Sequence, residues 1–336
     1  MAASATRWGI LGASRIAHDF LVAMKTLPEN EHTVVAVASR SLERAAEFAG
    51  KHDIGKAYGS YEELARDENV EVVYVSTLHP THAPLCKLAL NHGKHVLCEK
   101  PMTMNLKDTK ELFELAKAKG LFIMEAMWTR FFPLHADVKN LVDSNVLGEL
   151  RVALVTFGFN LDSVERLQDP NQGGGALLDL GIYCLNIVDM IFGGEEPLSI
   201  SAAGQKTSAG VDSTVTVTML FKGNKTASLT TSMAAQLPNE ATFIGSQGSV
   251  TIHAPFNSAT SFTSPAGIKE YPLPEPSMPI YFNNSTGMRY EIQAVRKSLL
   301  SGELENSTMP WKTTEKIFRW MDEIRRQIGV VYKEDM

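Results

Sequence analysis

Short apolar runs alternate with segments of helical length through the first third of the chain. The apolar runs lie at residues 8–11, 34–38, 72–77, 95–99 and 121–127. Helical patterns separate most of them, and the clearest covers residues 106–119. Strands that alternate with helices of this length predict a parallel, doubly wound sheet. We therefore expect an α/β domain at residues 1–127.

The pattern changes to a period of two between about residues 197 and 271. Thr214, Thr216 and Thr218 alternate there with Val215, Val217 and Met219. Such alternation predicts an open, mostly antiparallel sheet with one apolar face covered by helices and one flatter face of small residues. The flatter face is either a subunit interface or a solvated surface.

Two further helices are expected near the end of the chain, at residues 288–300 and 312–328. Six of the 15 prolines lie between Pro255 and Pro279, and they predict an irregular excursion. The second helix carries an apolar stripe typical of ordinary packing. We expect residues 128–336 to form a second, α+β domain, with the last helix packing back toward the first domain.

Length and charge narrow the possible functions. The chain has 336 residues and a net charge of −6, with no basic run. This length indicates two domains. The charge argues against nucleic acid and anionic membranes as partners. The sequence has no apolar signal core near its start and no apolar run approaching about 18 residues, so we expect a soluble, cytoplasmic protein.

The three cysteines predict no metal site. Cys86, Cys98 and Cys184 lie far apart and lack the spacing of metal ligands. Cys98 and Cys184 fall in apolar runs and are expected to be buried free thiols. A sparse, odd set of cysteines fits a reducing compartment.

The turn after the first strand is a candidate phosphate-binding turn. A dinucleotide fingerprint reads G-x-G-x-x-G at this place, and here it reads Gly12-x-Ser14-x-x-Ala17. Alanine at the last position still permits close packing of helix on strand. Ser14 offers its amide and hydroxyl to a phosphate, and Arg15 and Ile16 follow at the helix start. The alternative is an ordinary strand-to-helix turn.

The residues after the second strand favour NADP over NAD. NAD-selective enzymes usually place an acid here, whereas this chain has Ser39-Arg40-Ser41. The Arg40 guanidinium suits a 2′-phosphate and can stack on adenine, and both serines can donate hydroxyl hydrogen bonds. The alternative makes Ser41 a helix N-cap and Arg40 a solvated charge. Capping and phosphate binding are compatible.

Two further strand ends carry polar residues. Thr77 and His79 follow the strand at 72–77, near the expected position of nicotinamide. His82 is expected to be a hydrogen-bonded histidine at a helix start. The strand at 95–99 ends in Glu99-Lys100-Pro101. Proline holds the preceding Lys100 extended where parallel strands present their ligand sites. The alternative is a surface lysine paired with Glu99.

The second half contains a matching set of polar residues. Gly173-Gly174-Gly175 precedes an apolar helix in which Asp179 and Tyr183 are four residues apart and share one face. A carboxylate and a phenol in so apolar a helix need partners. The alternative is a buried tyrosine bonded to an aspartate. Earlier, residues 128–133 are dense in aromatics, and Trp128 is the one expected to face a ligand, although aromatics at a domain junction are more often core.

Three motifs, taken in order, resemble the Gfo/Idh/MocA family of sugar and polyol oxidoreductases. They are the NADP-type turn, the tripeptide Glu99-Lys100-Pro101 and the glycine run followed by the helix with Asp179 and Tyr183. The resemblance covers essentially the whole chain. The sequence is most similar to the dimeric dihydrodiol dehydrogenases, in stretches at 58–64, 128–133 and 173–183. The resemblance implies a Rossmann domain and a second domain whose sheets pair face to face in a homodimer.

For the site, the resemblance implies Lys100 and Tyr183 as the catalytic pair, with Asp179 as a supporting acid. It adds His79, Trp128, Arg151 and Phe157 as substrate-pocket candidates, and Thr77, Glu99 and Lys100 near the cofactor. Many family members carry histidine in place of Tyr183. Tyrosine is similar to the dihydrodiol, xylose and glucose–fructose enzymes and makes an inositol-type dehydrogenase less expected.

The implied reaction is NADP-dependent oxidation of trans-1,2-dihydrobenzene-1,2-diol to catechol, and of D-xylose to xylonolactone. A small-molecule diol or sugar is thus the expected substrate. A dedicated pentose or hexose dehydrogenase, or a reductase, is the first alternative. A non-catalytic NADP-binding sensor is the second, and it predicts a kept fingerprint with a decayed catalytic set.

Overall fold

A computed structural model describes residues 4–336 of the chain. The chain divides into two compact units. The first unit comprises Met1–Thr103, Lys107–Trp128 and Leu273–Thr314, and the second comprises Met104–Leu106, Thr129–Pro272 and Glu315–Met336. Each unit is therefore built from three stretches of chain.

The first unit contains a six-stranded parallel sheet, as the alternating pattern predicts. The strands are β1 (Thr6–Leu11), β2 (His32–Ala38), β3 (Ala57–Tyr58), β4 (Val72–Val75), β5 (His95–Glu99) and β6 (Ile123–Ala126). Their order is β3-β2-β1-β4-β5-β6, and every neighbouring pair is parallel. The order reverses between β1 and β4, which is the switch point where such sheets bind ligands. The doubly wound fold is confirmed.

Five helices connect these strands. They are α1 (Arg15–Met24), α2 (Leu42–His52), α3 (Tyr61–Arg66), α4 (His79–Asn91) and α5 (Leu106–Lys119). Ser14, Ser41 and Ser60 cap the starts of α1, α2 and α3, each accepting from a backbone amide three residues on. These polar N-caps satisfy amides of the first turn and so favour the start of each helix there.

Residues 273–314 complete the first unit and include α9 (Arg289–Leu300). The buried carboxylate of Asp19 on α1 accepts hydrogen bonds from the amides of Tyr281 and Phe282, the latter at 2.8 Å. The Trp311 indole donates to the Ile123 carbonyl at 2.9 Å. Contacts between residues far apart in the sequence thus join this stretch to the rest of the first unit.

The second unit contains an eight-stranded sheet in the order β14-β13-β12-β11-β7-β10-β9-β8. The strands are β7 (Leu150–Gly158), β8 (Ser199–Lys206), β9 (Asp212–Phe221), β10 (Lys225–Ser232), β11 (Ala241–Gly245), β12 (Ser249–Ile252), β13 (Ser261–Ser264) and β14 (Gly267–Glu270). All neighbours are antiparallel except β7 and β10. The predicted mostly antiparallel sheet is confirmed.

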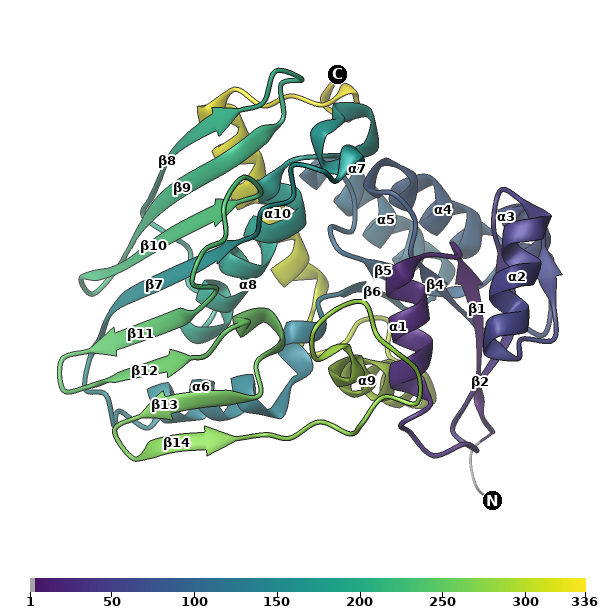
Figure 1. Cartoon of the computed structure of the whole chain (residues 1–336), viewed down its shortest axis with the longest axis horizontal. Coiled ribbons are helices and arrows are strands. Elements are labelled where there is room, and N and C mark those ends of the chain that lie inside the picture. The colour runs from purple at the N-terminus through teal and green to yellow at the C-terminus, as the bar shows by residue number, and fades with distance from the viewer. Residues whose placement is uncertain (1–3) are drawn as a thin grey trace. The chain divides into compact units, whose positions relative to one another are not determined.

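The two faces of this sheet differ, as the period of two predicts. Val215, Val217 and Met219 are buried, whereas Thr216 and Thr218 are exposed. The helices of this unit are α6 (Pro133–Asp143), α7 (Glu165–Gln168), α8 (Ile182–Ile191) and most of α10 (Trp311–Ile328), with a π-helical turn η3 (Leu177–Gly181) before α8. Figure 1 shows α6, α8 and α10 beside one face of the sheet. The opposite face carries no helix of the described chain.

Two sequence predictions need correction. By length and composition Pro170–Ile191 would qualify as a membrane span, so the expectation of no such run was wrong; 94% of its apolar window is buried inside the fold, as in a core helix. The stretch 255–279 is also less irregular than predicted, because it contains β13 and β14. Pro255, Pro265 and Pro272 lie outside those strands, where proline interrupts no ladder hydrogen bond.

Candidate active site

The turn after β1 packs closely against the Ser76 carbonyl at the end of β4. Gly12 has φ +114°, and a Cβ there would lie 2.8 Å from the Ser76 carbonyl oxygen. Only glycine fits this position. The Ser14 amide donates to the Gly12 carbonyl at 3.0 Å, and its hydroxyl accepts from Ala17 N at 3.2 Å. Both Ser14 groups that the sequence offers to a phosphate are thus used within the chain.

Arg15 and Ile16 are the first two residues of α1. The first amides of a helix have no partner within the helix, and their partial positive charge favours anions. Of the first-turn amides, Ala17 N is satisfied by Ser14. The helix start therefore remains a suitable phosphate site through the amides of Arg15 and Ile16.

The end of β2 presents two arginines. Ser41 caps α2, and the Ser39 hydroxyl accepts from Ser41 N at 3.4 Å. Arg40 is exposed and forms no ion pair with any described residue. Arg40 and Arg44 both act on the Tyr61 hydroxyl, whose pKa is nevertheless raised because burial outweighs them. Arg44 lies four residues after Arg40, in the first turn of α2. It was not singled out from the sequence, although this four-residue spacing could be read there.

The end of β4 is tied to the end of β5 through His82. His82 is fully buried; its Nδ1 lies 2.8 Å from the Pro101 carbonyl and its Nε2 3.1 Å from that of Thr77. Burial lowers the His82 pKa, with backbone hydrogen bonds opposing the shift and Lys100 adding to it. The prediction of a hydrogen-bonded, structural His82 is confirmed. His79, the first residue of α4, is buried with its ring edge-on to His82.

Lys100 follows β5, and neighbouring groups fix its backbone. The buried Glu99 carboxylate accepts from Lys100 N at 3.2 Å and from the Tyr74 hydroxyl. Two residues on, Met102 N donates to Glu125 Oε1 at 2.9 Å. The Lys100 side chain is half-buried at the carboxyl end of the strand. The first unit thus gathers its predicted residues at the carboxyl ends of β1, β2, β4 and β5.

In the second unit, Asp179 lies on η3 and forms an ion pair with Arg166. The Arg166 Nη2 lies 3.2 Å and 3.3 Å from the two Asp179 carboxylate oxygens. Asp179 is buried and Arg166 is partly exposed, so the ion pair joins a buried carboxylate to a guanidinium that solvent reaches. π-helical turns are rare and recur at functional sites. Arg166 was not predicted from the sequence, because the loop between it and η3 has no periodic pattern.

Tyr183 is the second residue of α8 and is 7% exposed. The Phe157 ring is edge-on to the Tyr183 ring at a centroid distance of 5.5 Å. Arg151 does not join them. It lies six residues earlier on β7, about 20 Å along the strand, and binds Glu149 and the Gly223 carbonyl. Trp128 is buried in the first unit, at the start of a short 3-10 turn.

The start of the helix that carries Asp179 and Tyr183 is held by Asp212. The buried Asp212 Oδ2 accepts from Leu177 N at 2.6 Å. Burial raises the Asp212 pKa to about 6, against the backbone hydrogen bonds that favour the carboxylate. Gly175 has φ +115°, and a Cβ there would lie 2.5 Å from Asp212 Oδ1. The glycine run therefore allows a carboxylate to approach this helix start.

The chain matches known proteins over nearly its whole length. Residues 6–127 match an oxidoreductase family with an NAD-binding Rossmann fold, and residues 135–251 match the GFO/IDH/MocA C-terminal domain. The trans-1,2-dihydrobenzene-1,2-diol dehydrogenase of Danio rerio is 46% identical, over 98% of this chain and 99% of that protein. The Homo sapiens protein of the same name is 44% identical over the same shares.

A solved structure is similar over the same extent. A 3-ketoreductase from Actinomadura kijaniata, in complex with NADP and TDP-benzene, has a TM-score of 0.83 and 25% sequence identity. The match covers 98% of this chain and 99% of that one.

Proposed function

The chain belongs to the Gfo/Idh/MocA oxidoreductase family, and from this premise we propose that it is an NADP-dependent dehydrogenase acting on a secondary ring hydroxyl. The family and the Rossmann sheet make it an oxidoreductase with an NAD(P)-binding domain. The observation that carries the proposal is the complete set of Lys100 at a strand end and Asp179 with Tyr183 on one helix.

The first unit fits a dinucleotide phosphate. Gly12 has a positive φ that lets the turn pack closely against the Ser76 carbonyl, and the α1 start supplies amides for the pyrophosphate. Arg40 and Arg44 supply cations for the 2′-phosphate, which NAD lacks. Ser39 and Ser41 flank that phosphate, and Thr77, His79 and Glu99 lie at the strand ends nearer the nicotinamide. The 3-ketoreductase, in complex with NADP, supports the same choice.

The residues of this chain perform the proton chemistry. A phenol ordinarily titrates near 10, and a nearby protonated amine favours the phenolate. Tyr183 takes the hydroxyl proton as general base, while Lys100 and Asp179 hold the substrate oxygen. When bound, the oxidised cofactor would supply the acceptor for the hydride of the carbinol carbon. Arg166 orients Asp179 through its ion pair.

We place the substrate among small diols and sugars. The relatives named for trans-1,2-dihydrobenzene-1,2-diol support that diol, whose ketone product would tautomerise to catechol. D-xylose in its ring form would give xylonolactone. Phe157 packs against Tyr183 and is the best-supported pocket residue, with His79 and Trp128 as further candidates. Arg151 is the weakest candidate, because its guanidinium is engaged at the other end of β7.

A homodimer through the open sheet face is part of the proposal. Leu154 on β7 is 46% exposed and lies between Ser228 of β10 and Thr242 of β11. Thr218 of β9 continues the same row. This flat row of small and apolar side chains suits an isologous interface. In this arrangement residues 1–127 bind the cofactor, and residues 128–336 supply the substrate site and the dimer contact.

The three free, buried thiols support a reducing compartment such as the cytoplasm. Two alternatives remain. A dedicated pentose or hexose dehydrogenase, or a reductase, would use the same catalytic set. A non-catalytic NADP-binding sensor is less supported, because it gives no reason to keep Lys100, Asp179 and Tyr183 together.

The test is a panel of trans-dihydrodiols, pentoses and hexoses with NADP, followed by absorbance of the reduced cofactor. Turnover fastest with the dihydrodiol or with D-xylose supports the proposal. Turnover only with other sugars, or only in the reductive direction, favours the first alternative. Tight NADP binding without any turnover favours the sensor.

A further inference from the structure

The C-terminal residues fold back onto the helix that precedes them. Arg325 on α10 is buried and donates to Asp322 and to both carboxylate oxygens of Asp335, with the shortest bonds at 2.6 Å. The Asp335 carboxylate also accepts from Tyr332 N at 2.9 Å. Burial opposes ionisation of Asp335, but these hydrogen bonds outweigh it and hold the Asp335 pKa below its usual value. The bidentate pair fixes residues 332–335 as an ordered turn.

This turn holds the start of the helix that carries Tyr183. The Tyr332 hydroxyl donates to the Gly174 carbonyl, and Tyr332 is 1% exposed. A Cβ on Gly175 would lie 2.9 Å from the same hydroxyl. The Tyr332 hydroxyl and the Asp212 carboxylate therefore both pack where a Gly175 side chain would lie. The peptide that leads into η3 is fixed by two buried groups from remote parts of the chain.

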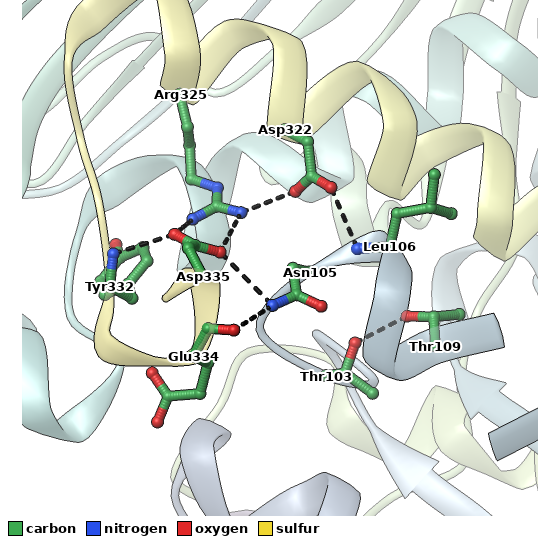
Figure 2. Close-up of polar contacts among 9 residues, drawn as sticks. All are labelled: Thr103, Asn105, Leu106, Thr109, Asp322, Arg325, Tyr332, Glu334 and Asp335. Atoms are coloured by element: carbon green, nitrogen blue, oxygen red, sulfur yellow. Dashed lines mark hydrogen bonds and ion pairs between the residues drawn. The ribbon is translucent and has the colours of Figure 1, made fainter. Parts of the chain in front are cut away.

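The same turn holds the peptide that follows Lys100. Asn105 Nδ2 donates to the Glu334 carbonyl at 2.9 Å and to Asp335 Oδ1 at 3.3 Å. Leu106 N, at the start of α5, donates to Asp322 Oδ2 at 3.0 Å. Figure 2 shows Arg325 between the two carboxylates, with Asn105 reaching the turn. Asn105 is five residues after Lys100, and all residues between them are buried.

One network therefore contacts two peptides, each near a residue of the proposed catalytic pair in sequence: Asn105 follows Lys100 by five residues, and Gly175 precedes Tyr183 by eight. Residues 104–106 and 174–175 both belong to the second unit, as does the turn. Misplacement of a reacting group by about 1 Å can lower a rate by about a hundredfold.

We propose that Tyr332 and Asn105 are positioning residues, through which the C-terminal turn at 332–335 sets the places of Tyr183 and Lys100. The proposal rests on the proposed function for its catalytic consequence. The structural part of the proposal, that the turn orders the two peptides, can be tested without the proposed function.

Two single variants and their combination test this on the full chain. Tyr332→Phe removes only the hydroxyl that binds Gly174, and Asn105→Ala removes the two bonds to the turn. We expect kcat to fall about threefold in each and at least about tenfold in the double variant. KM and the Kd for NADP should stay within twofold. Lys333→Ala, an exposed change in the same turn, and Tyr271→Phe, a hydroxyl loss at the sheet edge, should leave kcat unchanged.

Hydrogen exchange supplies the readout that needs no substrate. Peptides covering 174–183 should exchange faster in Tyr332→Phe, peptides covering 101–106 faster in Asn105→Ala, and both in the double variant. Unchanged exchange in both regions, or a wild-type kcat in the folded double variant, would overturn the proposal. If the wild-type protein turned over none of the panel, the proposed function would fail, and the exchange data would still decide whether the turn orders these peptides.

Discussion

The Nδ1 of His82 lies 2.8 Å from the carbonyl oxygen of Pro101, the residue after Lys100. The other ring nitrogen reaches the Thr77 carbonyl. A neutral imidazole has one N–H, so only one of these two carbonyls can accept from it at a time. The shorter contact favours the proton on Nδ1 and the bond to Pro101. A buried histidine on α4 thus fixes the backbone beside the proposed catalytic lysine.

Replacing His82 by Leu should therefore harm both stability and turnover. The variant removes the donor to the buried Pro101 carbonyl, and leaving that group unpaired costs about 1–3 kcal/mol of unfolding free energy. We expect kcat to fall about tenfold as the peptide after Lys100 loosens. Steady-state kinetics and urea unfolding measure the two effects. His92→Leu, at the other end of the same helix, is the matched control. A His82→Leu protein with normal kcat would show that this contact does not position Lys100.

Arg40 should decide the preference for NADP. Removing a charge-assisted hydrogen bond to phosphate costs about 1.5–3 kcal/mol, so Arg40→Ala should weaken NADP binding roughly 10- to 100-fold. NAD binding should change little, because NAD has no 2′-phosphate. Titration calorimetry with both cofactors measures this, with Arg66→Ala as a control on an exposed arginine paired to Glu62. Equal wild-type affinity for the two cofactors would remove the assignment.

The open sheet face should hold two chains together. Leu154→Lys places a charge in the centre of that face, and we expect it to convert a dimer of twice 36.9 kDa into a monomer. Light scattering after gel filtration gives the mass. Leu300→Lys alters a similarly exposed leucine on α9 and should leave the dimer intact. A monomeric wild-type protein would show that the chain forms no dimer. A dimer that is unaffected by Leu154→Lys would show that the interface lies on another surface.

Acid should destabilise the second unit through His135. This residue is fully buried, its Nε2 lies 2.8 Å from the Phe256 carbonyl, and burial lowers its pKa to about 4. The unfolded chain binds the proton near pH 6.5 and the native chain only near 4. The unfolding free energy should thus fall between pH 6.5 and 4, by up to about 3 kcal/mol from this group.

The variant His135→Gln isolates that contribution. Urea unfolding at pH 7.0, 5.5 and 4.5 should show a shallower loss of stability than in the wild type. His32 and His52 have pKa values lowered to about 4 as well, so a residual slope is expected in the variant. If the unfolding free energies of variant and wild type fell in parallel with pH, His135 would not contribute to the loss of stability in acid.

Much of the fold was predictable because it follows local patterns. The helix expected at 106–119 is α5, Leu106–Lys119, and the strand ends that carry Arg40 and Lys100 follow from apolar runs. The strand β7 was missed, as was its parallel pairing with β10. Its pairing partners lie more than 70 residues away along the chain, and local periodicity carries no information on such pairing.

The candidate site was predictable only in its chemistry. Lys100, Asp179 and Tyr183 were recognisable from motif and resemblance, and their roles stay predictions. The partners that hold them were not: Arg166 returns to Asp179 through an irregular loop, and Tyr332 reaches Gly174 across 158 positions of sequence. Such contacts depend on tertiary folding, and neither hydrophobic period nor residue spacing reports them.

The most direct measurement of the central claim is turnover by Lys100→Met, made beside NADP affinity in the same protein. Methionine keeps the length and apolar stem of lysine and removes the charge. We predict a loss of kcat of about a thousandfold or more with NADP affinity within a few-fold, and the same for Tyr183→Phe. Lys107→Met, an exposed lysine on α5, should behave as wild type. Near-normal turnover in Lys100→Met would contradict the assignment of the catalytic pair.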